Sequence, residues 1–258
     1  MNEEKDLIEE LNAAKDHLSA LRQAKAGEFY PSIEEQELYI ESIREELGFL
    51  EAGQSEELAE KADVEAMAVG SGDGLAVVVG HCLFKEGACG IAPIENCEAA
   101  YNTPIAERIV SICESKGIRS KVFSRAWGDK CLINTTYKKR VMPWKPRCTV
   151  ELHYNGGNVD DPYTVTLFAR NDSRSWALQL QKEISAVFDR PVSQEKKVWL
   201  LKSGQNGHSS TKHLSNSALV EPFFGNHPAD AKMGHERKEE YAQAIVKAYA
   251  DFTGALTS

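Results

Sequence analysis

The sequence lacks the features that would indicate a membrane protein, a secreted protein or a repeat protein. No stretch approaches the roughly 18 consecutive apolar residues that a transmembrane helix needs. The acidic start, residues 1–6, has neither the basic residues nor the apolar run of a signal peptide. No internal repeat and no low-complexity tract occurs. We therefore expect a protein that is made in a cytoplasm, does not insert stably into a membrane, and stays there unless something else releases it.

Paired cysteines of the Cys-x-x-Cys type are also missing, although the chain has six cysteines. In a protein expected in a reducing cytoplasm, reduced thiols are the default expectation. Three of the six, Cys82, Cys89 and Cys97, follow shortly after His81 and could in principle supply thiolates to a metal. Their spacing fits no zinc-finger pattern, so we favour ordinary thiols over metal ligands.

The net charge of −9 is distributed unevenly along the 258 residues. Residues 1–65 hold 19 acidic and 6 basic residues, and residues 66–258 hold 20 acidic and 24 basic residues. The acidic balance therefore belongs to the N-terminal piece alone, and the larger piece is mildly basic. A mildly basic domain would suit an anionic polymer substrate better than the whole-chain charge suggests. We expect no nucleic-acid partner.

Residues 1–50 predict a helical hairpin. The first helix carries a heptad-like seam of apolar residues, namely Leu7, Leu11, Ala14, Leu18 and Leu21. Ser32, followed by Glu35, has the spacing of a capping box that starts a second amphipathic helix. Neither helix can bury its seam alone, so we expect them to pair with each other, with the main domain, or with another copy of the chain in a homo-oligomer. Residues 51–74, which end in a glycine-rich stretch, read as a linker.

From residue 75 onward, short apolar stretches alternate with longer amphipathic ones. Valine-rich or alternating stretches predict strands, and stretches with an apolar residue every three to four positions predict helices. The expected strands cover 75–80, 120–124, 148–153, 163–169, 197–202 and 217–221, and the expected helices cover 98–116, 173–188 and part of 230–252. This alternation predicts an α/β fold with a central mixed, largely parallel sheet flanked by helices. We assign residues 75–258 to a single catalytic domain.

Three of the expected strands end on a residue that can ligate a metal or carry a proton. His81 follows the first strand, His153 ends the third, and Glu221 ends the last. Glu98 opens the helix after the first strand. Because ligands of open α/β sheets bind where strands end, these four residues are expected to meet. Two histidines and a glutamate are a ligand set of zinc hydrolases, which leave a fourth position for water, and a second glutamate could serve as the base.

Each of these residues also has a plain structural explanation. A single histidine at a strand end is more often structural than metal-bound, and a glutamate at a helix start is favoured by the helix dipole. Glu221, which precedes a proline, could lie in a solvated turn. Four such residues in one α/β domain, three of them at strand ends, nevertheless favour a metal site.

The residues around these positions resemble the zinc-dependent N-acetylmuramoyl-L-alanine amidases of the Amidase_3 type. The resemblance extends from about residue 75 to residue 252, and four short motifs occur in the family's order. The form with Glu151 two residues before the histidine is similar to that of phage-encoded members, and hence to phage or prophage endolysins. The motifs are Val79-Gly80-His81 with Gly87-Ala88, Glu98-Ala99-Ala100-Tyr101-Asn102, Glu151-Leu152-His153-Tyr154-Asn155, and Val220-Glu221-Pro222-Phe223-Phe224-Gly225-Asn226.

The resemblance implies that zinc is bound by His81, Glu98 and His153, and that Glu221 is the catalytic carboxylate. It implies hydrolysis of the amide bond between N-acetylmuramic acid and L-alanine in peptidoglycan. Glu95 is a rival for the third ligand, but Asn102 stands in the matching register with Glu98. The N-terminal helices lie outside the resemblance.

Two other functions remain open at the level of sequence. The same ligand set would serve a zinc carboxypeptidase-like hydrolase acting on another amide. Alternatively, the heptad helices could belong to a virion or wall-binding structural protein whose α/β domain is inactive. An intact set of four site residues argues against the inactive protein, because a binding module would not need all of them.

Overall fold

The computed structural model describes residues 72–82, 85–125, 132–157, 159–190 and 197–255, together with Asn12. The predicted helical hairpin and nearly all of the predicted linker lie outside these residues, so they remain predictions. Within the described residues no helix combines the length and the apolar character needed to cross a bilayer.

The predicted α/β class with a mixed, largely parallel sheet is confirmed. The strands are β1 (Leu75–Val79), β2 (Ser120–Phe123), β3 (Cys148–Leu152), β4 (Val165–Phe168), β5 (Val198–Leu200) and β6 (Ser217–Glu221). They form one sheet of six described strands in the order β2-β1-β3-β6-β4-β5. All neighbouring strands pair in parallel except β4 and β6, which are antiparallel.

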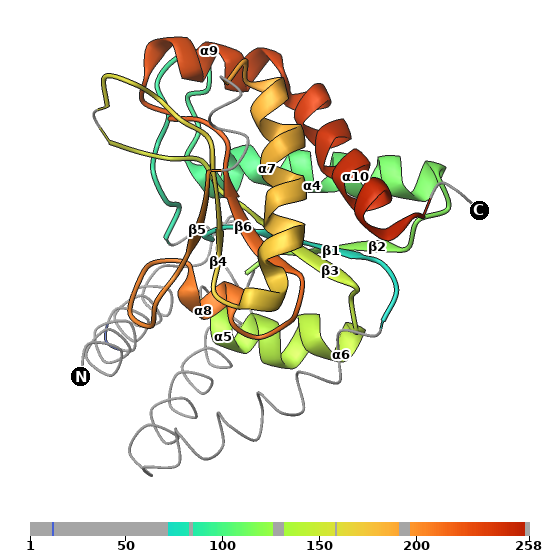
Figure 1. Cartoon of the computed structure of the whole chain (residues 1–258). Coiled ribbons are helices and arrows are strands. Elements are labelled where there is room, and N and C mark those ends of the chain that lie inside the picture. Colours follow the sequence, from blue (N-terminus) through green and yellow to red (C-terminus); the bar gives the residue numbers. More distant parts are fainter. Residues whose placement is uncertain are drawn as a thin grey trace, which may run out of the picture.

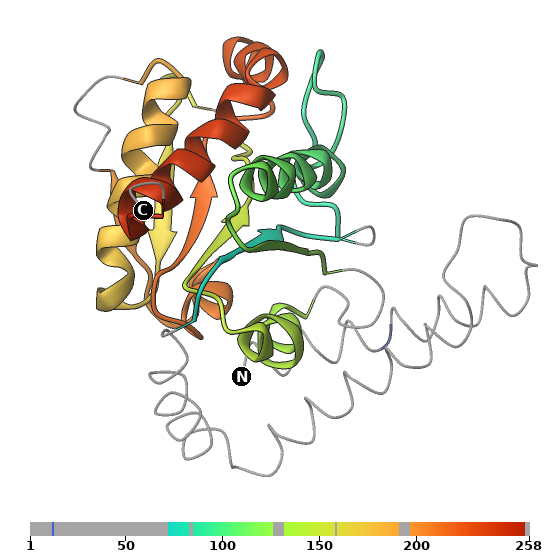
Figure 2. The same ribbon diagram turned by 90° about the vertical axis from the view of Figure 1, so that its right-hand side faces the viewer.

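Helices cover both faces of this sheet, as Figures 1 and 2 show. One face carries α4 (Glu98–Ser115), α7 (Arg174–Val187) and α10 (Lys238–Thr253). The other face carries the shorter α5 (Ile133–Thr136), the π-helix η2 (Tyr137–Val141), α6 (Met142–Trp144) and α8 (His208–Thr211). The 3-10 turn η3 (Asn171–Ser173) precedes α7, and α9 (Pro228–Glu236) follows the loop after β6. A sheet covered on both faces needs strands that are apolar throughout, and all five residues of β1 are buried.

The alternation of side chains along the strands divides the interior into two layers. Val77 of β1 and Val150 of β3 pack with α4, α7 and α10 in the larger layer, which holds the buried Trp176. Val78 of β1 faces the opposite layer and packs with Tyr137 of η2. The indole nitrogen of Trp176 donates a hydrogen bond of 2.9 Å to the carbonyl of Thr149, which joins α7 to the central strand.

The structure differs from the sequence-based expectation mainly in the C-terminal half. The terminal helix is interrupted at Arg237, where α9 ends and α10 begins. Residues 203–216, which lie between two of the expected strands, contain the short helix α8. His213, within that segment, is buried, and its Nε2 atom lies 2.8 Å from Oδ1 of Asn134.

A buried ion pair holds the chain just after β6. Asp230, at the start of α9, accepts a hydrogen bond of 2.6 Å from Arg190 and one of 2.9 Å from the backbone nitrogen of Phe224. The Arg190 and Asp230 side chains are 8% and 1% exposed. Because water reaches neither charge well, each needs the other as an ionic partner.

We expect Asp230→Ala to lower the free energy of unfolding by about 3–5 kcal/mol, because it leaves the buried Arg190 charge without its carboxylate partner. Asp172→Ala is the control, because Asp172 pairs with Arg170 at a surface position where its side chain is 47% exposed. That control should change stability by less than about 1 kcal/mol. Urea unfolding of both variants measures the difference, and equal effects would contradict this account of the pair.

Candidate functional site

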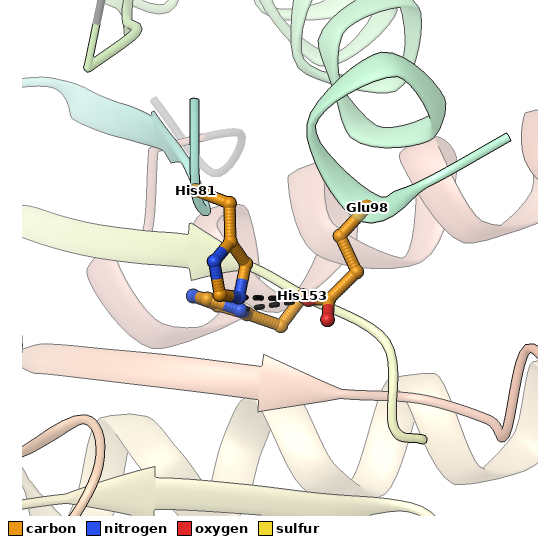
Figure 3. A group of neighbouring side chains, drawn as sticks. All are labelled: His81, Glu98 and His153. Atoms are coloured by element: carbon orange, nitrogen blue, oxygen red, sulfur yellow. Dashed lines mark hydrogen bonds and ion pairs between the residues drawn. The ribbon is translucent and has the colours of Figure 1, made fainter. Parts of the chain in front are cut away.

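The predicted site residues meet at the carboxyl edge of the sheet. Because β1, β3 and β6 are parallel neighbours, their ends lie side by side, and these ends lead into His81, His153 and Glu221. Glu98 is the first residue of α4, which starts over the same edge (Figure 3). Four residues that span 140 positions of sequence are thus brought to one place by strand pairing.

His81, Glu98 and His153 form a group that could hold a metal ion. Oε2 of Glu98 lies 2.8 Å from Nδ1 of His153 and 3.5 Å from Nε2 of His81. The two imidazole rings meet edge to face, with 4.8 Å between their centroids. One donor atom from each residue lies within 4.8 Å of the other two. Two nitrogens and one carboxylate oxygen, converging on a single point, fit the donor types and number of a catalytic zinc site.

The rival ligand Glu95 does not take part in this group. Its side chain is exposed, whereas Glu98 is 4% exposed and directed toward the two histidines. Asn102, one turn further along α4, is fully buried beneath the helix. The choice of Glu98 over Glu95 therefore agrees with the geometry.

The loop between β1 and α4 holds Glu98 in place. Its carboxylate accepts hydrogen bonds from the backbone nitrogens of Ala88, at 2.9 Å, and Tyr154, at 3.2 Å. In return, the first nitrogens of α4 donate to the carbonyls of Ala88 and Glu86. These carbonyls replace a side-chain cap, which α4 lacks. The same loop therefore fixes both the start of α4 and the carboxylate of Glu98, the possible metal ligand.

The expectation of reduced thiols is wrong for this loop. Cys89 and Cys97 form a disulfide bond, and Cys82 is also disulfide-bonded. The chain folds back on itself here, since Gly90 donates to the carbonyl of Asn96 and the two bonded cysteines face each other across a short antiparallel bridge. Glu86, Cys89 and Cys97 also lie close enough to hold a metal, but the disulfide consumes both thiols. Among the described cysteines, Cys113 and Cys148 are free and buried, as expected for ordinary thiols.

His81 adopts an uncommon backbone conformation, with φ of 60°. A non-glycine residue in this region costs energy and is often found at functional sites. The glycines around it permit close packing: a Cβ atom on Gly80 would lie 2.5 Å from Nε2 of His153, and one on Gly87 would lie 2.6 Å from the His81 ring. The glycines of the first motif are therefore required by the approach of the two imidazoles.

Sequence reasoning missed the role of two further residues, Glu151 and Arg125. Glu151 lies on the same face of β3 as His153, is fully buried, and its Oε1 atom is 3.0 Å from Nε2 of His153. Arg125 donates a hydrogen bond to the same carboxylate oxygen. A charged residue two positions before a histidine in an otherwise apolar strand was the available signal, because alternate residues share a face. Nothing in the sequence pointed to Arg125.

The charges in this cluster control one another's protonation. Burial alone would lower the pKa of His153, but hydrogen bonds to Glu151 and Glu98 raise it to about 9. Burial and the neighbouring His153 lower the pKa of His81 to about 4. Burial would raise the pKa of Glu151, but Arg125 and His153 lower it to about 2. Burial likewise opposes ionisation of Glu98, yet its contacts with His153 hold its pKa below the usual value.

Glu221 and the three possible ligands line one cavity of about 370 Å³. The cavity is lined by Arg125, Tyr154, Asn155, Asn206 and Ser210 besides the four predicted residues. Burial and the Glu98 charge raise the pKa of the Glu221 carboxyl, and His153 and Asn155 offset this in part. A carboxylate with a raised pKa beside a metal-capable group has the properties of a general acid and base.

A larger groove of about 1010 Å³ lies between α4, α7 and α10, but neither of the metal-capable groups found among the described residues lines it.

No protein-family model and no curated protein matches this sequence. Solved structures do match the fold. The catalytic domain of CwlV, an N-acetylmuramoyl-L-alanine amidase from Bacillus (Paenibacillus) polymyxa var. colistinus, is similar with a TM-score of 0.59 at 18% identity, over 71% of this chain and 99% of that one. The catalytic domain of the CD27L endolysin, which targets Clostridia difficile, matches with a TM-score of 0.56 at 21% identity. The match covers 70% of this chain and 98% of that domain. AmiC2 of Nostoc punctiforme, an N-acetylmuramoyl-L-alanine amidase, matches with a TM-score of 0.57 at 18% identity. The match covers 71% of this chain and 99% of that one. At these identities the likeness establishes a shared fold, and it extends over nearly the whole of each matched domain.

We expect zinc binding at pH 6 to release about one proton per ion. His153, with a pKa of about 9, is protonated at that pH and must lose a proton to become a ligand, whereas His81 is already neutral. For the same reason the apparent zinc affinity should rise as the pH rises toward 9. Calorimetric titration in two buffers of different ionisation enthalpy measures the release.

The control is His81→Ala, which should bind zinc more weakly but still release about one proton per ion. If the unmodified protein binds zinc and releases no proton to the buffer, His153 does not lose a proton to become a ligand, and the prediction is wrong.

Proposed function

We propose that this chain is a zinc-dependent N-acetylmuramoyl-L-alanine amidase, which hydrolyses the amide bond between N-acetylmuramic acid and L-alanine in peptidoglycan. The observation that carries the proposal is the convergence of His81, Glu98 and His153 in a cavity that Glu221 also lines. The amidase fold of the similar structures supports the choice of substrate. The similar CD27L endolysin domain, together with the Glu151 form of the third motif, supports a phage or prophage endolysin.

His81, Glu98 and His153 would hold the zinc ion. When bound, zinc supplies a Lewis acid that lowers the pKa of water and polarises the scissile carbonyl. Glu98 keeps its orientation through two backbone hydrogen bonds, so its position does not depend on the metal. A ligand held before the metal arrives reduces the entropic cost of assembling the site.

Glu221 would transfer the proton in this reaction. As a carboxylate, it takes a proton from the attacking water while the water oxygen bonds to the carbonyl carbon. It then gives that proton to the nitrogen of L-alanine as the carbon–nitrogen bond breaks, which restores the carboxylate. Its raised pKa suits both steps, since proton transfer is most efficient when the pKa lies near the working pH.

The cavity around the site fits a polymer with polar groups. Asn155, Asn206 and Ser210 contribute amides and a hydroxyl to its lining, and Arg125 contributes a cation. Hydrogen-bonding side chains of this kind bind sugar hydroxyls and peptide amides. This lining supports peptidoglycan as the substrate partner.

Metal analysis and wall lysis on one purified sample test the proposal. We expect about one equivalent of zinc, and lysis that a chelator abolishes and zinc restores. The products should contain a newly exposed amino group on L-alanine. Release of a C-terminal residue instead would identify a carboxypeptidase-like enzyme, and intact walls with no bound metal would overturn the proposal.

We expect Glu221→Gln to retain zinc and to lose about 10²–10⁴-fold in the rate of hydrolysis, because the amide cannot accept a proton. Glu95→Gln is the matched control, since Glu95 is exposed and lies outside the metal-capable group. That control should hydrolyse peptidoglycan at the unmodified rate. A Glu221→Gln variant with near-full activity would remove Glu221 from this role.

A further inference from the structure

Both ring nitrogens of His153 are bound to carboxylates, and the two carboxylates lie on opposite sides of the ring. Nδ1 lies 2.8 Å from Oε2 of Glu98, and Nε2 lies 3.0 Å from Oε1 of Glu151. The same Oε2 atom of Glu98 lies 3.5 Å from Nε2 of His81. The point on which the three possible ligands converge is therefore on the Nδ1 side of the ring.

Glu151 contacts the imidazole ring of His153 on the Nε2 side, away from the possible metal position. Its side chain is completely buried, on the face of β3 opposite to that of Val150 and Leu152. It is not part of either group of described residues that could ligate a metal. Its charge is matched by Arg125, whose side chain is 13% exposed and reaches it from the segment that follows β2. A carboxylate so enclosed cannot rotate away to solvent.

We propose that Glu151, held by Arg125, is a positioning residue that fixes the orientation and tautomer of His153 for metal binding. A neutral histidine that ligates through Nδ1 keeps its proton on Nε2, and Glu151 accepts the hydrogen bond from that proton. The ring then presents Nδ1 to the metal together with Glu98 and His81. This inference deepens the proposed function, because it rests on His153 being a metal ligand.

Arg125 has a distinct part in this arrangement. A buried carboxylate without a cation would be strongly destabilising. Arg125 donates to Oε1 of Glu151, the same oxygen that lies 3.0 Å from Nε2 of His153, and so holds that oxygen against the ring. The pair is built from segments 26 positions apart, so its assembly depends on the pairing of β1 with both β2 and β3.

The double variant Glu151→Gln with Arg125→Gln tests the proposal without leaving a buried charge unpaired. We expect its zinc affinity to fall by about 10–100-fold, which is the usual effect of removing the hydrogen-bond partner of a metal-ligating histidine. Competition with a chromophoric chelator at fixed pH measures the zinc dissociation constant of the purified full chain. Nitrogen-15 NMR of labelled histidines, assigned with His153→Gln, reports which nitrogen binds zinc. The unmodified protein should show zinc at Nδ1 of His153 and a proton at Nε2.

Thr149→Val is the matched control. Thr149 lies on the same face of β3, two residues before Glu151, and its hydroxyl donates a buried hydrogen bond of 2.6 Å to Ser217. This variant should unfold more easily than the unmodified protein but keep its zinc affinity within about threefold. A purely structural role for Glu151 would make the two variants alike in both measurements.

The outcomes separate this inference from the proposed function. An unchanged zinc affinity in the double variant, or zinc at Nε2 of His153, would overturn the role of Glu151 even if the protein cleaves peptidoglycan. A lowered affinity with zinc at Nδ1 would support that role even if the unmodified protein leaves peptidoglycan intact. An unmodified protein that binds no zinc would overturn both.

Discussion

The parallel pairing of β1, β3 and β6 is the constraint on which the site depends. Val79 stands opposite Leu152, and Leu152 stands opposite Val220, so the residues that follow emerge together at one edge of the sheet. The pairing continues past the strands, because Gly80 donates to the carbonyl of Leu152 and His153 donates to that of Val220. Backbone hydrogen bonds therefore determine the distance between His81, His153 and Glu221. A shift of one residue in register would turn each side chain to the other face.

This arrangement concentrates charge in a place where water is largely excluded. Glu98, Glu151 and His153 are all less than a tenth exposed, and each would be costly to bury alone. They are tolerated because each contacts an opposite charge or a backbone donor, from Arg125 at one end to the nitrogens of Ala88 and Tyr154 at the other. Such a cluster contributes little to stability in itself, and its presence is explained better by what it can bind.

The loop between β1 and α4 shows how the fold supports the site beyond the strands. It carries the Cys89–Cys97 disulfide directly before Glu98, and the disulfide-bonded Cys82 directly after His81. Two of the three possible ligands therefore adjoin a covalent cross-link. A cross-link limits the conformations of the loop in the unfolded chain and so favours the native arrangement. The three similar solved structures share this fold at 18–21% identity, which indicates that strand pairing and apolar layering can be preserved by very different sequences.

The sequence by itself determined the strands, the two long helices α4 and α7, and the positions of the histidines and glutamates at strand ends. These features depend on local periodicity, so they can be recognised within a short window of residues. The register of Asn102 already favoured Glu98 over Glu95, but only the tertiary structure brought the Glu98 carboxylate to the two histidines. It also joined Cys89 to Cys97, and placed Arg125 and Glu151 behind His153. Such contacts depend on the distance between segments remote in the chain, and that distance is set only when the sheet has assembled and its helices have packed.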